Sequence, residues 1–212
     1  MKKALILSIA LLFAAGCDSV YYGTMEKFGK HKRDILVDRV EEARDSQEQT
    51  KEQFASALEK FKSVVNVPTG KLQVKYDTLK AEFDESEAKA AAVKKRIADV
   101  EEVAKDLFTE WKDELEQYKN RELKSSSQKQ LDETRKRYNE MIAAMKRAES
   151  RIEPVLSAFR DQVLFLKHNL NAQAIASLQT EVTTMETDIG RLIEEMEKSI
   201  AEADSFIKNM KE

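Results

Sequence analysis

Residues 131–166, with the sequence LDETRKRYNEMIAAMKRAESRIEPVLSAFRDQVLFL, carry the pattern that decides the fold. Mostly apolar side chains recur in this stretch at alternating spacings of three and four residues. A mean spacing of about 3.5 residues keeps one face of an α-helix turned toward a partner helix along its length. The stretch therefore predicts a long helix with coiled-coil packing. The positions of this series are Leu131, Thr134, Tyr138, Met141, Met145, Ala148, Ile152, Val155, Phe159, Gln162 and Leu166.

Three further series with the same spacing run from Leu36 to Val64, from Leu72 to Tyr118 and from Ile175 to Met210. Only five glycines and two prolines interrupt a chain that is 35% charged, a composition typical of long helices. We therefore expect an all-α fold, an elongated antiparallel four-helix bundle of the coiled-coil type with up-down-up-down order, because short joints make sequential helices antiparallel. The alternative is an extended pair of hairpins that completes its core by dimerising. The helices are expected at about residues 24–66, 71–123, 127–167 and 172–210, within one domain of residues 24–212.

Each expected joint has a local signal. The sequence Val67-Pro68-Thr69-Gly70 breaks the first helix, because proline restricts the residue before it and glycine permits a turn. The second joint is expected at Lys124–Ser126, followed by a capping box of Ser127 and Gln130. Asn171 is the expected N-cap of the last helix, with one helix that continues through residues 167–172 as the alternative.

Pro154 falls inside the third expected helix. A proline removes one backbone hydrogen bond there and its ring clashes with the preceding turn. The apolar spacing nevertheless continues from Ile152 to Val155 and Phe159 without a shift. We therefore expect one kinked helix rather than two helices, with the proline as a static bend or a mobile joint.

The N-terminus has the organisation of a signal peptide. Lys2 and Lys3 precede an apolar run, residues 4–13, that is too short to span a bilayer. Small residues 14–16 then precede Cys17, the only cysteine of the chain. This arrangement resembles the bacterial lipobox, which implies that residues 1–16 are removed and that Cys17 carries acyl chains such as palmitate, with residues 17–23 as a lipidated N-terminus and short tether. The alternative is an ordinary secretory signal with a buried cysteine nearby.

The expected location and the net charge of the mature chain limit its possible partners. An acylated Cys17 would hold the protein at a membrane that faces the periplasm, and Asp18 resembles the signal that retains lipoproteins at the inner rather than the outer membrane. Loss of residues 1–16 removes two lysines and changes the formal net charge from −3 to about −5. This charge argues against nucleic acid as a partner. The expected partners are the membrane, through the anchor, and an unidentified envelope protein or a second copy of the chain.

Two groups of residues are candidate contact sites. Near the anchor, a basic cluster has the chemistry to attract anionic phospholipid head groups, although a solvated helix face is the alternative. This cluster consists of Lys27, Lys30, His31, Lys32 and Arg33. At the opposite end, the expected topology brings two joints together into a possible docking tip, with capped turns over a packed core as the alternative. The residues of this tip are Lys71, Lys167, His168, Asn169 and Asn171.

We expect no enzyme, no cofactor and no metal site. The two histidines, His31 and His168, fall at opposite ends of the expected bundle, so they form no pair of metal ligands. Gly70-Lys71 lacks the upstream glycine and the following Ser or Thr of a phosphate-binding loop. Two functions from different classes are consistent with the chain. One is a structural spacer or docking adaptor in the cell envelope, and the other is a carrier for a small ligand or lipid within the bundle.

Two segments carry a family resemblance. Residues 21–40, YYGTMEKFGKHKRDILVDRV, and residues 163–175, VLFLKHNLNAQAI, resemble an uncharacterised family of coiled-coil lipoproteins of Gram-negative bacteria, a domain of unknown function. The resemblance covers essentially the whole mature chain. It implies the helical lipoprotein class and brings no activity, cofactor or catalytic residue.

Overall fold

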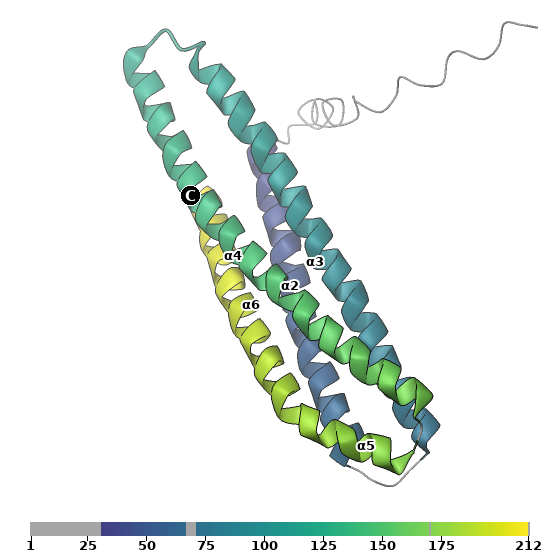
Figure 1. Cartoon of the computed structure of the whole chain (residues 1–212). Coiled ribbons are helices and arrows are strands. Elements are labelled where there is room, and N and C mark those ends of the chain that lie inside the picture. The colour runs from purple at the N-terminus through teal and green to yellow at the C-terminus, as the bar shows by residue number, and fades with distance from the viewer. Residues whose placement is uncertain (1–30, 67–70, 170, 212) are drawn as a thin grey trace, which may run out of the picture.

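The computed structural model describes residues 31–66, 71–169 and 171–211. All secondary structure within these ranges is helical. Figure 1 shows long helices that run antiparallel to one another, which confirms the expected all-α bundle. The elements are α2 (Lys32–Asn66), α3 (Leu72–Leu115), α4 (Arg121–His168), α5 (Ala172–Leu178), the 3-10 helix η1 (Gln179–Glu181) and α6 (Val182–Lys211).

The four long helices α2, α3, α4 and α6 surround one core. Helix α2 packs against α3 and α6, and α4 packs against the same two helices from the opposite side. The apolar positions of the four series fill the space between them, with Leu36, Phe54, Phe61 and Phe159 completely buried. Aromatic rings meet edge to face in the half of the core nearest residues 61 and 159, where the ring centre of Phe159 lies 6.4 Å from that of Phe61 and 5.8 Å from that of Phe83.

Two joints lie together at one end of the bundle, as the sequence predicts. The C-terminal end of α2, the start of α3, the C-terminal end of α4 and the short helix α5 all lie there (Figure 1). Asn171 caps α5 as expected, because its Oδ1 accepts a hydrogen bond of 2.8 Å from the backbone N–H of Ala174. The breaking residues 67–70 lie outside the described ranges.

The position that the sequence predicts for the second joint is wrong. Helix α3 ends at Leu115 rather than near 123, and α4 begins at Arg121 rather than at 127. The N-cap is Asn120, whose Oδ1 accepts from the backbone N–H groups of Glu122 at 2.9 Å and Leu123 at 3.2 Å. The apolar seam of α3 rotates onto Leu115, which is 1% exposed. The cap and the rotated seam together end α3 earlier, because nothing apolar beyond Leu115 is buried in the core.

The expected capping box at Ser127 is also wrong, because no helix begins at this residue. Ser127 lies within α4, and its hydroxyl accepts a hydrogen bond of 2.9 Å from the indole N–H of Trp111. The bond ties α3 to α4 just before the turn between them.

Two other helix boundaries also differ from expectation. Helix α2 begins at Lys32 and His31 is not helical, whereas the sequence predicts a start near 24; residues 24–30 lie outside the described ranges. The last helix is not continuous, because η1 separates α5 from α6. The hydroxyl of Thr180 donates to the carbonyl of Ser177 at 2.8 Å, a bond over three residues that fits the tighter 3-10 winding. The interruption lets α5 cross the end of the bundle before α6 turns along it (Figure 1).

Pro154 sits inside α4, which runs through it as one helix. The expectation of one helix rather than two is confirmed. The proline is exposed, so its ring faces solvent and the neighbouring Ile152 and Val155 stay buried.

Candidate functional site

The distal tip, defined as the end of the bundle that carries Asn66, Lys71, residues 167–169 and Asn171, presents both polar and apolar side chains. Lys71, Lys167 and His168 are exposed. Asn169 ends α4, because its side-chain amide donates to the carbonyl of Phe165 at 2.9 Å. Asn171 is exposed while it caps α5. The side chains of Asn169 and Asn171 thus bond the backbone at the ends of α4 and α5. The side chains of Lys71, Lys167 and His168 face solvent.

Three large apolar side chains are exposed near the same tip. They are Val74 in the first turn of α3 and Leu164 and Phe165 in the last turns of α4. The sequence-based site did not include them, since 4-3 spacing identifies the buried face of a helix and not the exposed apolar residues beside it. Together with the charged residues they make the distal tip a mixed surface of the kind that protein contacts use.

The described part of the basic cluster joins the helix ends. Lys32 forms an ion pair of 3.0 Å with Glu110 of α3. The guanidinium of Arg33 donates to the backbone carbonyl of Met210 in the last turn of α6. These two cations therefore connect the start of α2 to both neighbouring helices, a role that the sequence did not indicate. His31 is exposed, and Lys27 and Lys30 lie outside the described residues.

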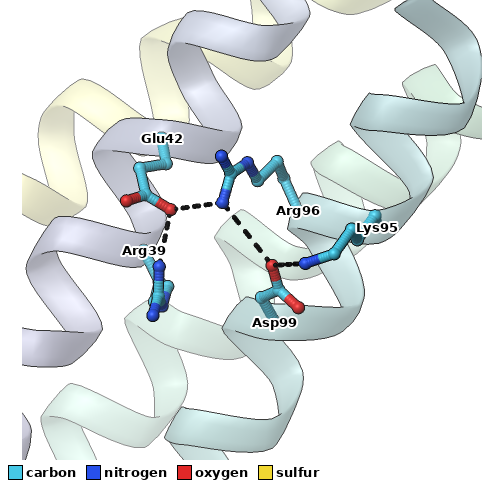
Figure 2. A network of polar contacts seen from close by, with 5 residues as sticks. All are labelled: Arg39, Glu42, Lys95, Arg96 and Asp99. Atoms are coloured by element: carbon cyan, nitrogen blue, oxygen red, sulfur yellow. Dashed lines mark hydrogen bonds and ion pairs between the residues drawn. The ribbon is translucent and has the colours of Figure 1, made fainter. Parts of the chain in front are cut away.

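A network of charges joins α2 to α3 midway along the bundle (Figure 2). Glu42 accepts from Arg39 at 2.8 Å and from Arg96 at 2.7 Å. Asp99 lies 2.8 Å from Lys95 and 3.7 Å from Arg96. Each carboxylate faces two cations on half-exposed side chains, which is the arrangement of a surface ion-pair network and adds little stability per pair. Its role is to align α2 and α3.

A polar layer crosses the core between α2 and α6. The hydroxyl of Ser199 donates to Oε1 of Gln47 at 2.7 Å, and both residues are completely buried. The Nε2 atom of Gln47 is buried and finds no hydrogen-bond partner among the described residues. Thr50 is buried beside this layer and donates to the carbonyl of Ser46 at 2.7 Å. Buried polar residues of this kind fix the register of neighbouring helices at a cost in stability.

An open groove of about 800 Å³ follows the outer boundary of α3 and α4. Its floor includes Ala91, Ile152 and Leu156, and carboxylates line its rim. Arg160 closes one end by pairing with Glu87 at 2.8 Å. The groove is shallow and open to solvent. Across the described ranges, His, Cys, Asp and Glu side chains form no group of three that suits a metal ion.

None of the helices in the described ranges has an apolar run that suffices to span a bilayer.

The fold defines the chain as an all-helical bundle protein. The chain belongs to the family described as "Protein of unknown function (DUF2959)", whose profile matches residues 21–210. The match covers the whole described bundle apart from Lys211, and it confirms the expectation of an uncharacterised helical family. Among proteins of curated function, none matches this chain.

Proposed function

We propose that this chain is a lipid-anchored protein of the cell envelope, whose bundle acts as a spacer or as a docking rod for another envelope component. The observation that supports this most strongly is the N-terminal pattern, in which two lysines, an apolar run and small residues lead to a sole cysteine at position 17. Acylation of Cys17 by more than one chain would give stable anchoring.

The dimensions of the bundle suit a rod. Helix α4 has 48 residues, which corresponds to roughly 70 Å at about 1.5 Å per residue. The chain enters α2 at one end, and the distal tip lies at the other (Figure 1). A partner that binds the distal tip would therefore be held roughly one bundle length away from the anchored end.

The alternative function, a carrier of a small ligand or lipid within the bundle, has less support. A carrier needs an internal cavity, and the large buried side chains of the described core are packed against one another. Within this core, the ring of Phe159 packs edge to face against the rings of both Phe61 and Phe83. A ligand that raised the melting temperature of the purified chain would support the carrier function.

Fractionation of cells tests the anchor. The chain with Cys17→Ser should move from the membrane pellet to the soluble fraction and should lose incorporation of a labelled palmitate analogue. Ser19→Ala is the matched control, because it changes a small polar residue two positions away and leaves the cysteine intact. A Cys17→Ser chain that stays in the pellet and still carries the label contradicts the proposal.

Crosslinking in intact cells tests docking. Photoreactive residues at Lys71 and His168 should capture the same envelope protein, and a photoreactive residue at exposed Lys136 in α4 should not. Crosslinks only between copies of this chain support a self-associating spacer. Equal capture at all three positions, or none at the tip, contradicts a docking function for this end.

A further inference from the structure

Among the described residues, one end of the bundle consists of the two helices α3 and α4. The ion pair between Lys32 and Glu110, and the bond from Arg33 to the carbonyl of Met210, place the start of α2 and the end of α6 beside α3 at residue 110. Helix α3 continues past this level to Leu115, and α4 returns from Arg121. Figure 1 shows the turn between α3 and α4 projecting beyond the start of α2 and the C-terminal end of α6.

The length of this projection follows from the pairing of α4 with α6. Arg147 lies 4.0 Å from Glu195, and the two helices are antiparallel. Counting from this pair places Leu131 of α4 opposite Lys211, the last residue of α6. The ten residues 121–130 then extend about 15 Å beyond the end of α6.

The projecting turn carries apolar and cationic side chains together. Tyr118 is 42% exposed and Leu123 is 57% exposed. Lys119 and Arg121 lie between them in sequence and are exposed. We define these four residues as the turn surface. The Asn120 cap bonds two backbone N–H groups of α4, so the cationic and apolar residues on either side of it are held in one ordered turn.

Carboxylates also lie in the projecting segment, where Asp113, Glu114, Glu116 and Glu122 balance its cations. Glu116 forms an ion pair of 3.1 Å with Lys124. Glu122 lies in the first turn of α4, where the positive end of the helix dipole stabilises a carboxylate. Lys119 and Arg121 are exposed and form no ion pair with another described residue, so their charged groups face solvent.

The position of the turn surface indicates what it meets. Helix α2 begins at this same end, and thirteen residues lie between Cys17 and His31 in the sequence. Such a segment spans at most about 50 Å, so a bilayer that holds Cys17 lies within reach of the turn. The segment itself carries two cations, Lys27 and Lys30, and two acids, Asp18 and Glu26.

We propose that the α3–α4 turn is a second membrane contact, in which Tyr118 and Leu123 enter the interface of an anionic phospholipid bilayer while Lys119 and Arg121 bind its phosphate groups. Tyrosine prefers the head-group level, and cations near an anionic surface gain electrostatic attraction. The inference rests on the proposed lipid anchor. Contact at both Cys17 and the turn surface restrains the tilt of the bundle, so that the distal tip points away from the membrane.

The test uses the mature chain, residues 17–212, attached to vesicles through its sole cysteine by a maleimide lipid. A tryptophan reporter is introduced as Tyr118→Trp, and as Val74→Trp at the distal tip, each with Trp111→Phe. Vesicles of phosphatidylglycerol and phosphatidylcholine with brominated acyl chains quench tryptophans that enter the interface. We expect quenching of the Tyr118→Trp reporter and none of the Val74→Trp reporter. Equal quenching of the two, or no quenching of the Tyr118→Trp reporter, overturns the proposal.

Charge variants test the role of the cations. Without chemical coupling, Lys119→Gln with Arg121→Gln should weaken binding to these vesicles by about 5-fold per lost cation. Lys136→Gln with Arg137→Gln removes the same charge from an exposed part of α4 away from the turn and should change binding less. Equal weakening by both pairs contradicts a specific turn surface.

Two further controls keep the outcome interpretable. If Trp111→Phe lowers the helical content, the measurement is repeated with Trp111 retained, and the quenching of the unmodified chain is subtracted. Because coupling imposes the anchor chemically, the result does not depend on acylation in cells. Failure of the turn contact is therefore distinct from failure of the proposed anchor, which the Cys17→Ser fractionation reports.

Discussion

Replacement of the buried amide in the polar layer should stabilise the bundle. Gln47 is completely buried, its Oε1 accepts from Ser199 at 2.7 Å, and its Nε2 has no partner among the described residues. A buried donor without a partner costs about 1–3 kcal/mol, while the bond to Ser199 contributes only about 1 kcal/mol. Leucine has a similar size and no polar atom, and the hydroxyl of Ser199 can turn to the carbonyl four residues earlier in its own helix, so Gln47→Leu should raise the free energy of unfolding by about 1 kcal/mol.

The partner of Gln47 should respond in the opposite direction. Ser199→Ala removes the donor and leaves Oε1 of Gln47 without a bond as well, so the free energy of unfolding should fall by about 2 kcal/mol. In the Gln47→Leu background the same change should cost less than about 0.5 kcal/mol, because no acceptor is left behind. The two substitutions are therefore strongly coupled.

Urea unfolding followed by far-UV circular dichroism measures all four chains of this cycle, made without residues 1–16 and with Cys17→Ser. Thr50→Val serves as a comparison, since Thr50 is equally buried but its hydroxyl is bonded to a carbonyl of its own helix. A loss of more than about 1 kcal/mol in Gln47→Leu would refute the reasoning. It would mean that the amide has a bonding partner, such as a buried water, and that the layer stabilises the fold.

Three other changes test separate parts of the structure. Phe159→Ala should lower the free energy of unfolding by about 3–5 kcal/mol, because its ring is completely buried between two others; a loss below about 1 kcal/mol in urea unfolding would contradict the packing. Asn120→Ala should cost about 1 kcal/mol through loss of the α4 cap, whereas no change in thermal unfolding would argue against the observed start of α4. Burial, with a smaller contribution from Glu101, raises the pKa of Tyr138 to about 12 from its usual value of 10. The folded state thus favours the neutral phenol, so stability is complete below pH 10 and falls as the pH rises toward 12. Tyr138→Phe should lose less stability over that interval, and identical pH profiles of the two chains would count against a buried phenol.

The sequence predicted the helices because their apolar seams are long and regular. The same regularity explains the error at the second joint. The 4-3 series of α3 continues through Tyr118, so spacing alone placed the helix end near residue 123, while the structure buries Leu115 and exposes Tyr118. The sequence signal at Ser127 pointed to a cap, whereas the structure caps α4 with Asn120 and bonds Ser127 to Trp111 of α3, a contact that the local pattern does not reveal.

The contact surfaces were only partly predictable, for a related reason. The sequence placed Lys32 and Arg33 in a basic cluster near the expected anchor. Their partners, Glu110 and Met210, are far away in the sequence, and helical spacing says nothing about which residues face each other across a bundle. Pairing across the core is set by the register of the helices. That register depends on the joint lengths and on the polar layer, which the apolar pattern alone did not reveal.

Mass spectrometry of the N-terminal peptide, from protein purified out of its own membrane, tests the central claim most directly. The account predicts a chain that begins at Cys17, with acyl chains on the cysteine sulfur and on its amino group. A chain that begins at Met1, or one cut elsewhere that carries an unmodified Cys17, would contradict the lipid anchor and with it the proposed envelope function.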